Sequence, residues 1–161
     1  MTRNEEIIER AKRGESVEGL SLASVDLSGR DLSGLNLAGA RLSHVNLAGA
    51  NLKGARVSGA MLVSCSLAGA DLTGAELGKL IGSMLDLRNA VLDQADLREA
   101  KLALCDLRGA RLRGATLEQA ALVRSDASGA DFEGAALAEV RFDAGRFNGS
   151  SFAKVEAKAA S

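Results

Sequence analysis

The 161-residue chain contains no proline, tryptophan or tyrosine, and it has one histidine and two cysteines. Without proline, every backbone N–H remains available for a hydrogen-bonded ladder. With aromatic residues at 2%, the core has to be built from aliphatic side chains, mainly Leu and Ala. The one histidine, His44, has no fixed carboxylate or thiol neighbour in the sequence pattern, so we read it as an ordinary surface residue.

Long apolar runs and a strong charge bias are also missing. No stretch approaches the roughly 18 apolar residues of a membrane span, and the N-terminal segment MTRNEEIIERAK lacks the apolar run of a signal peptide. Twenty Lys and Arg stand against 21 Asp and Glu, for a net charge of −1, which argues against a polybasic nucleic-acid binder. We expect a soluble, cytoplasmic protein with no membrane contact, no direct nucleic-acid binding and no small-molecule substrate.

A five-residue period runs through most of the chain. It is clearest in residues 31–55, DLSGLNLAGARLSHVNLAGANLKGA, where leucine recurs at 32, 37, 42, 47 and 52. A helix turns about 100° per residue and a strand alternates faces every two residues, so a period of five fits neither. A coil that turns one corner per repeat does fit, and a short fixed period is typical of a solenoid.

Each repeat has the same internal order around its leucine, which we call position i. Position i is Leu or Phe from residue 22 to 152 except at Val57, Gly82 and Ala127. A small residue, usually Ala, stands at i−2, and a polar residue, often Asp or Asn, stands at i−1. Alternation along three extended residues points i−2 and i inward and i−1 outward. The other two residues form a corner, where a recurring glycine accepts the positive φ of a type II turn.

This pattern resembles A(D/N)LXX, the repeat of the pentapeptide repeat family, over about residues 20 to 155. The resemblance implies an all-β fold, a right-handed quadrilateral β-helix with four pentapeptides, or twenty residues, in each coil. The 27 repeats then make about seven coils. At a strand spacing of about 4.8 Å, the rod is roughly 30 Å long.

The first coil of such a rod exposes unpaired edge groups that need a cover. Asn4 is a favourable N-cap and two glutamates follow it, which suits the positive end of a helix dipole. We expect a short helix from about Asn4 to Arg13, closed by Gly14, with a frayed polar tail as the alternative. The chain then divides into an N-terminal helical cap (1–18), the pentapeptide-repeat β-helix (19–155) and a C-terminal tail (156–161).

The last repeats replace leucine with phenylalanine, at 132, 142, 147 and 152, and only a polar tail follows them. An apolar rod end without a cap invites a partner. The quinolone-resistance members of the resembled family dimerise through their C-terminal coils. We therefore regard Phe142, Phe147 and Phe152 as a possible homodimer end.

Three inward positions depart from the pattern. Gly82 replaces the inward leucine and should open a cavity costing about 2–5 kcal/mol, but Leu80 and Leu85 stand where alanine is usual. Because they add volume on both sides, we expect an unbroken coil, with a local bulge as the alternative. Cys65 and Cys105 both occupy i−2, forty residues and so two coils apart. That separation of about 9–10 Å exceeds disulfide reach, so we expect two small core residues.

Stacking residues twenty apart singles out one face of the rod. Its outward positions are apolar where the other faces carry mainly Asp, Asn, Ser, Arg and Lys. Six apolar residues are expected to be neighbours on this surface: Met61, Val63, Ile81, Met84, Leu104 and Val123. A contiguous patch of several hundred Å² is typical of an interface. The alternative is that distortion around Gly82 turns some of these side chains inward.

The sequence contains no constellation typical of a catalytic, cofactor or metal site. The aspartates recur at five or ten residues, so Asp86, Asp106 and Asp126 stack on one face with Arg88 and Arg108 nearby. Alternating charges of this kind form a solvated face, and a flat ladder does not converge on one metal ion. The glycines come one per turn and form no phosphate loop. We expect no enzyme activity and no cofactor.

Two functions are compatible with these features. The first is a non-enzymatic scaffold whose apolar face, centred on Ile81 and Met84, docks a protein partner or a second copy. The alternative is a DNA-mimicking binder of DNA gyrase or another DNA-binding protein, because gyrase-protecting members of the family resemble B-form DNA in size and surface charge. A stacked column matches that charge in part: Asp26, Asn46, Asp86, Asp106 and Asp126. A net charge of −1 is nevertheless a weak imitation of a polymer with one charge per about 1.7 Å.

Overall fold

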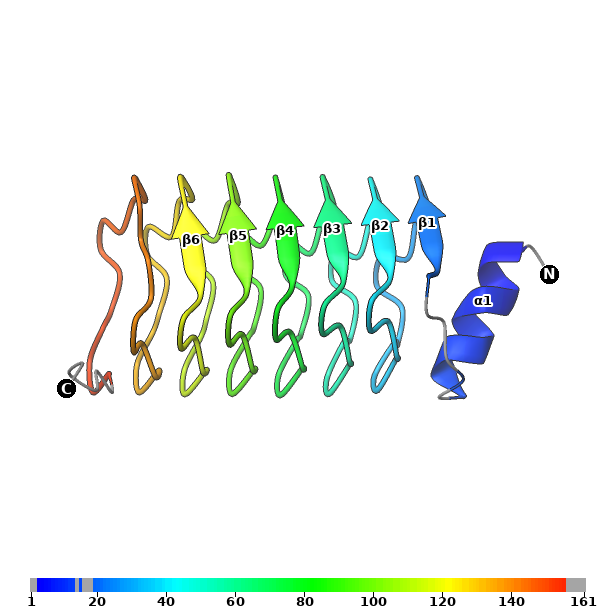
Figure 1. Ribbon diagram of the computed structural model, residues 1–161, viewed down its shortest axis with the longest axis horizontal. Helices are drawn as coiled ribbons and strands as arrows, with labels where there is room; N and C mark the ends of the chain where they lie inside the picture. The colour runs from blue at the N-terminus through cyan, green and yellow to red at the C-terminus, as the bar shows by residue number, and fades with distance from the viewer. Residues whose placement is uncertain (1–2, 14, 16–18, 156–161) are drawn as a thin grey trace.

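The chain winds into a rod of stacked coils with a helix at its N-terminal end (Figure 1). The computed structural model describes residues 3–13, 15 and 19–155. Its elements are α1 (Arg3–Lys12), β1 (Ser21–Ala23), β2 (Arg41–Ser43), β3 (Met61–Val63), β4 (Ile81–Ser83), β5 (Lys101–Ala103) and β6 (Ala121–Val123). The six strands form one parallel sheet in the order β1-β2-β3-β4-β5-β6.

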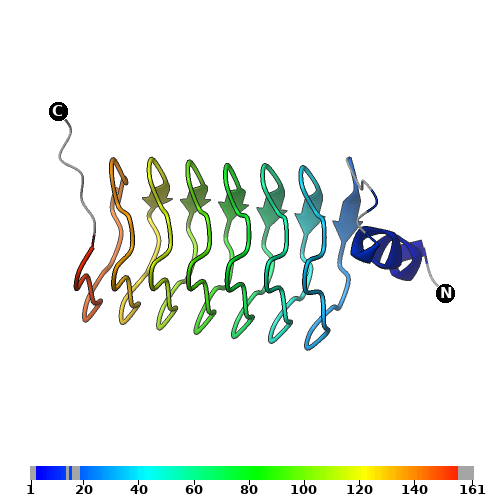
Figure 2. The ribbon, with the colours of Figure 1, turned by 90° about the horizontal axis from the view of Figure 1, so that it is seen from below.

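Each strand pairs with the next at an offset of twenty residues, so that Leu22 lies beside Leu42. Isolated parallel bridges such as Asp31↔Asn51 carry the same offset along the other three sides. The expected right-handed quadrilateral β-helix is therefore confirmed. The chain makes five full turns between β1 and β6, and bridges continue the register through Ser151. The expected count of about seven coils also includes these end segments. Figure 2 shows the coils from below as separate parallel loops.

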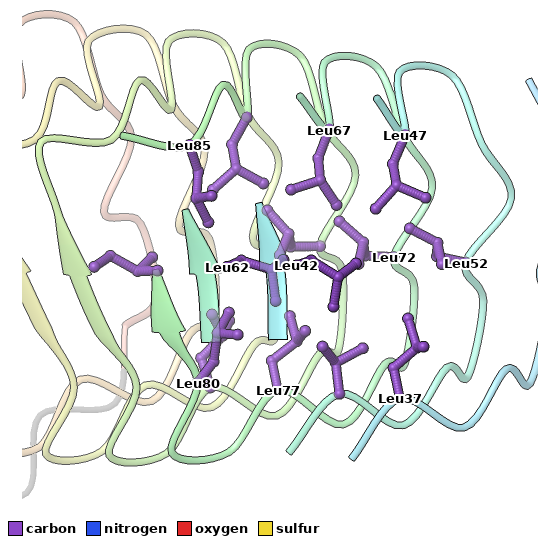
Figure 3. Close-up of a pocket in the computed structure, with 15 residues that line it drawn as sticks. Leu37, Leu42, Leu47, Leu52, Leu62, Leu67, Leu72, Leu77, Leu80 and Leu85 are labelled. Carbon is purple, nitrogen blue, oxygen red and sulfur yellow. The ribbon is translucent and has the colours of Figure 1, made fainter. Parts of the chain in front are cut away.

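The inward positions form a continuous aliphatic interior. The leucines at i and the alanines at i−2 are almost all buried along the rod, as the alternation predicts. Leucines reach toward the axis from different sides of the coil, as Leu47, Leu52 and Leu77 do in Figure 3. They leave a cavity of about 30 Å³ between Leu37 and Leu102 that is lined only by leucine and valine. A cavity lined in this way stays dry.

The coil is unbroken at Gly82, as expected. Gly82 lies within β4 and pairs with Leu62 and Leu102. A Cβ placed on it would lie 2.7 Å from Leu85 Cδ1 and 2.7 Å from Leu102 Cδ2. Leu80 and Leu85 are both buried. The neighbouring side chains therefore fill the space of the missing leucine, and the alternative of a local bulge does not occur.

Three of the four corners of each coil are closed by a hydrogen bond within the turn. At the corner after Leu47, the Ala50 N–H donates to the Leu47 carbonyl at 3.1 Å. Asn46, at i−1, accepts the Ala48 N–H at 3.1 Å through its side-chain oxygen. Gly49 sits at i+2 with a φ of 65°. The recurring Asp or Asn at i−1 and Gly at i+2 therefore each have a backbone cause.

The fourth corner, after each strand of the sheet, is built differently. There the strand extends one residue past the inward position, so that Ser43 pairs with Ala23 and Val63. The residue at i+1 belongs to the ladder, and the sequence places no Asp or Asn at i−1 from β1 to β6. The i+2 residue keeps a positive φ of 52° to 57° without a glycine at Ser24, His44, Ser64, Met84, Leu104, Arg124 and Ala144. The glycine corner expected from the sequence is thus wrong for this column.

The helix α1 covers the N-terminal end of the rod. Its Ile8 is buried and joins the hydrophobic core, against which Leu20 and Val25 also pack. The expected capping helix is confirmed, although it runs from Arg3 to Lys12 and Asn4 lies inside it rather than at its cap. Gly14 and the tail 156–161 lie outside the described residues, so the domain boundaries stay predictions. In the described ranges, no helix is long and apolar enough to cross a bilayer.

Candidate interaction surfaces

We define the β-face as the outward residues of strands β1–β6 together with the corner residues that follow them. Six of its residues form what we call the apolar patch: Met61, Val63, Ile81, Met84, Leu104 and Val123. On β3, Met61 and Val63 flank the inward Leu62, so strand alternation turns both of them outward. Ile81 pairs with Met61, one strand spacing of about 4.8 Å away. The stacking of coils thus brings residues from three strands, β3, β4 and β6, and from the corners after β4 and β5 onto one surface.

The apolar patch is exposed to solvent. Met61 is 41% exposed, Ile81 44%, and Met84 and Leu104 51% each, while the two valines are partly exposed. Among the residues that the structure describes, Phe152 is the only other exposed large hydrophobic side chain. The distortion around Gly82 therefore does not turn these side chains inward. Whether the patch binds a partner stays a prediction.

Met84 and Leu104 also occupy an unfavourable backbone conformation. Their φ angles are 54° and 57°, in the left-handed region that costs an L-residue about 1–2 kcal/mol. At the equivalent position of the following corner, Gly109 has a φ of 68° without that cost. The chain thus holds two large apolar side chains where glycine would relieve the backbone. Polar residues with a similar φ and no glycine also occur on the other faces, as at Lys79 and Gln94.

The acidic column that motivated the DNA-mimic hypothesis lies on the adjacent face. Its members pair from coil to coil in the order Asp26, Asn46, Ser66, Asp86, Asp106, Asp126 and Arg146. Arg88 binds Asp86 at 2.7 Å and Arg108 binds Asp106 at 2.6 Å. Hydrogen bonds from these guanidinium groups lower the pKa of both carboxyls. The negative charge of the column is therefore neutralised in its middle.

The remaining aspartates of this column hold their own corners. Asp26 accepts the Ser28 N–H at 3.0 Å, and Asp126 accepts the Ser128 N–H at 3.0 Å. Hydrogen bonds from Ser28 and Ser128 lower the pKa of Asp26 and Asp126, respectively. Their spacing in the sequence identifies these residues only as outward ladder members. Asp and Asn recur two residues before a corner N–H that has no partner within the turn. This recurrence is the sequence signal for the structural role of the aspartates.

The four phenylalanines gather at the C-terminal end of the rod. The rings of Phe132 and Phe152 stack with centroids 4.9 Å apart, and those of Phe142 and Phe147 meet edge-on at 4.8 Å. Phe132 is buried, Phe142 and Phe147 are partly buried, and Phe152 is 37% exposed. The rings thus pack together inside the last coils. Dimerisation through Phe142, Phe147 and Phe152 stays a prediction.

Comparison with protein families tests the resemblance noted in the sequence. The family described as pentapeptide repeats matches at residues 21–59, 40–78, 85–119, 105–143 and 117–152, in eight copies. These segments cover most of the rod. The chain belongs to the pentapeptide repeat family. No curated protein matches it.

Solved structures similar to this pentapeptide repeat protein come from several sources. QnrB1, a plasmid-mediated fluoroquinolone resistance protein, is 19% identical with a TM-score of 0.50, covering 86% of this chain and 75% of its own. Rfr23 from the cyanobacterium Cyanothece 51142 is 20% identical with a TM-score of 0.39, covering 96% and 95%. A pentapeptide repeat protein of the Arabidopsis thaliana thylakoid lumen is 30% identical with a TM-score of 0.29, covering 73% and 68%. The likeness to QnrB1 shows a shared fold alone.

The histidine of this pentapeptide repeat protein is exposed, whereas its two cysteines are buried. His44 is exposed at a β-face corner, where its Nδ1 lies 2.8 Å from the Ser43 hydroxyl. Cys65 and Cys105 are free and buried, and burial raises the pKa of the Cys105 thiol to about 11. In the described part of the chain, no three His, Cys, Asp or Glu residues are grouped to hold a metal ion. The two cysteines thus lie in the core as small, protonated residues.

Proposed function

We propose that this pentapeptide repeat protein is a non-enzymatic interaction module, a rigid scaffold whose β-face docks another protein or a second copy of the chain. The observation that carries the proposal is the apolar patch, where four large apolar side chains are each 41% to 51% exposed. Burial of apolar surface contributes about 25 cal/mol per Å² to association. A patch of this kind on a soluble rod supports a binding role.

The rod itself suits such a role because its backbone is fixed by a ladder on all four sides. Ile81 N–H donates to Ala60 at 2.9 Å and Met84 N–H to Ala103 at 3.0 Å. The patch is therefore held in place before a partner arrives, and little conformational entropy is lost on binding.

The test compares two double variants with the same charge change. Ile81→Asp with Met84→Asp places charge in the apolar patch. Val91→Asp with Ala136→Asp is the matched control, because both residues are bridge members on other faces and both stand at i−1, where Asp is usual. The measurements are molar mass by light scattering coupled to size exclusion, and the proteins retained from a cell lysate by each immobilised variant.

We expect the patch variant to lose association and the control to keep it. A homodimer that becomes monomeric only in the patch variant assigns the β-face to self-association. A monomer throughout, with a protein retained by wild type and control but not by the patch variant, assigns it to a foreign partner. Equal molar mass and equal retention for all three proteins would contradict the proposal. A dimer lost instead on Phe152→Ser would move the interface to the C-terminal end.

The second candidate function is a DNA mimic that binds DNA gyrase or another DNA-binding protein. It is favoured by the stacked Asp26, Asp86, Asp106 and Asp126 and by a fold shared with a fluoroquinolone resistance protein. The salt bridges of Arg88 and Arg108 weaken it, since they interrupt the negative field. The DNA-mimic hypothesis is tested by measuring the supercoiling activity of DNA gyrase in the presence of the protein. Inhibition or protection at micromolar protein would support the mimic, and no effect would remove it.

A further inference from the structure

Three cations border the apolar patch on the β-face. Arg41 pairs with Met61 and so lies one coil before it. Lys101 pairs with Ile81 and lies one coil after it. Arg124 occupies the corner after β6, with a φ of 52°. Because coils stack about 4.8 Å apart, each cation lies beside apolar side chains. Arg41 thus precedes the patch along the rod, whereas Lys101 and Arg124 lie in the same coils as Leu104 and Val123.

The nearest carboxylate on the same side of the rod as these cations is Asp143, one coil after β6, and Arg141 binds it. From β2 to β6, the outward and corner positions of the β-face hold no aspartate or glutamate. Arg41, Lys101 and Arg124 are exposed, and none of them forms a salt bridge with a residue that the structure describes. On the adjacent face, Arg88 and Arg108 each bind a carboxylate. The β-face is thus positive on a chain of net charge −1.

This charge pattern disfavours pairing of two β-faces. If two rods met with their coils aligned in the same direction, Arg41 would face Arg41 and Lys101 would face Lys101. If they met in opposite directions about β4, β2 of one copy would lie over β6 of the other, and Arg41 would approach Arg124. In both arrangements Arg41 meets another cation, and the nearest carboxylate, Asp143, is already bound by Arg141, so the pairing is costly. The occupant that relieves this cost brings its own carboxylates.

We infer that the β-face binds an amphipathic helix of another protein, whose aliphatic side chains cover the apolar patch and whose Asp or Glu side chains pair with Arg41, Lys101 and Arg124. This inference rests on the proposed function of the β-face and adds the chemistry of its partner. Complementary charge around an apolar centre fixes the register of the partner and speeds its encounter with the surface. A helix laid in this way is a common mode of peptide recognition.

The extent of the surface sets the length of the helix. Arg41 lies on β2 and Arg124 follows β6, four coil steps apart, which is about 19 Å at the usual strand spacing. A helix of about 13 residues covers that distance at 1.5 Å per residue. One of its carboxylates then lies near the end over Arg41 and the others lie over the coils of Lys101 and Arg124, with its aliphatic residues turned toward the patch.

The experiment uses two labelled peptides of about 14 residues, long enough for nearly four helical turns. Both carry the same leucines on one face, flanked by glutamates in the acidic probe and by lysines in the basic probe. Their affinity for the full chain is measured by fluorescence anisotropy. The test variant is Arg41→Glu with Lys101→Glu. The matched control is Arg30→Glu with Arg146→Glu, two exposed arginines on other faces. Sedimentation with vesicles of anionic phosphatidylglycerol is measured alongside.

We expect the acidic probe to bind at least tenfold more tightly than the basic probe, and the test variant to weaken it at least tenfold while the control changes it less than twofold. Raising salt from about 50 to about 500 mM should reduce the difference. Equal binding by wild type and test variant, with loss in the Ile81→Asp, Met84→Asp variant, would overturn the acidic partner and leave the docking face standing. The inference would also be overturned if the acidic probe did not bind, or if the chain bound the vesicles instead. If neither the Arg41→Glu, Lys101→Glu variant nor the Ile81→Asp, Met84→Asp variant lost affinity for the acidic probe, the result would count against both proposals.

Discussion

The β-face and the other three faces are built from the same pentapeptide, yet they use its outward positions differently. On the three faces, Asp or Asn at i−1 accepts a corner N–H, as Asp71 does from Thr73 at 3.0 Å, and glycine commonly takes the left-handed corner. On the β-face, the ladder extends to i+1 and position i−1 carries Arg41, Met61, Ile81 or Lys101. Where the ladder satisfies the backbone, the outward side chains are free for another purpose.

The corner residues sharpen this comparison. Gly69, on a neighbouring face, adopts a φ of 64°, and a Cβ added to it would meet no other atom within 4 Å. Met84 adopts almost the same conformation, with a φ of 54°. The two positions therefore share a left-handed φ, although the hydrogen bonds of their corners differ. Where the other faces have a left-handed corner without glycine, the residue is polar, as at Lys79 and Gln94, whereas the β-face carries Met84 and Leu104.

The largest expected effect comes from restoring the missing inward leucine. Gly82→Leu should destabilise the rod by about 3 kcal/mol, because Leu85 and Leu102 already occupy the space. Adding Leu85→Ala should recover most of that loss, since it returns the volume. Chemical denaturation gives the free energy of unfolding. A single variant as stable as wild type would mean that the β-face interior has room to spare.

The next largest change in the free energy of unfolding is expected when corner residues are exchanged between the β-face and the other faces. Met84→Gly and Leu104→Gly should each raise the free energy of unfolding by about 1 kcal/mol, because glycine removes the left-handed strain. Gly69→Met should lower it by a similar amount. Thermal unfolding measures both changes. A double variant that combines Met84→Gly and Leu104→Gly should bind the proposed partner at least tenfold less tightly. Unchanged binding would show that these two side chains are not needed for docking.

A smaller difference in stability is expected between variants at two consecutive i−1 positions, Asp96 and Lys101. Asp96 accepts the Arg98 N–H at 3.0 Å and the Arg98 guanidinium at 2.5 Å, so Asp96→Ala should cost about 0.5–1.5 kcal/mol. Lys101, the next i−1 residue along the chain, lies on the β-face and caps no corner. Lys101→Ala should change stability by less than about 0.5 kcal/mol. Equal costs in denaturant titrations would remove the distinction between the faces.

The smallest effect is a dependence of stability on acid. Asp86, Asp96 and Asp106 have lowered pKa values, mainly because arginine hydrogen bonds stabilise their charged forms. Their contribution is present above the unfolded carboxyl pKa of about 3.9 and is lost as the pH falls through the lower folded values. We expect flat stability from neutral pH to about 5 and a decline below about 4. Replacing Asp86 and Asp106 with Asn should flatten that decline, and an unchanged acid profile would assign it to other groups.

Much of the fold could be predicted because the pattern repeats so often. The five-residue beat of Leu and the alternation with Ala give the inward side chains and the corners, and the family resemblance supplies the four-sided closure. The unbroken coil at Gly82 followed from counting volume at Leu80 and Leu85. These predictions depend only on which side chains are apolar and how large they are.

The features that the sequence did not predict depend on backbone hydrogen bonds. The positive φ of Met84 and Leu104 was missed because glycine was taken as its marker. The outward aspartates accept corner N–H groups, and this role was missed because the hydropathy pattern does not show which backbone N–H groups need a partner. Both follow once the twenty-residue register is known, since one column of corners contains no glycine and one row of i−1 positions contains no Asp or Asn. For the proposed partner, the sequence offers only the surface that would bind it, an apolar patch with cations beside it.

The central claim is that the β-face is the docking surface. The direct test is affinity capture with quantitative mass spectrometry, using tagged wild type, the Ile81→Asp, Met84→Asp variant and the Val91→Asp, Ala136→Asp control, each with an untagged copy of the chain present. We expect wild type and control to retain the same proteins, and the patch variant to retain at least tenfold less of the specific partner. Undiminished retention by the patch variant, whether of a foreign protein or of the untagged copy, would contradict the claim.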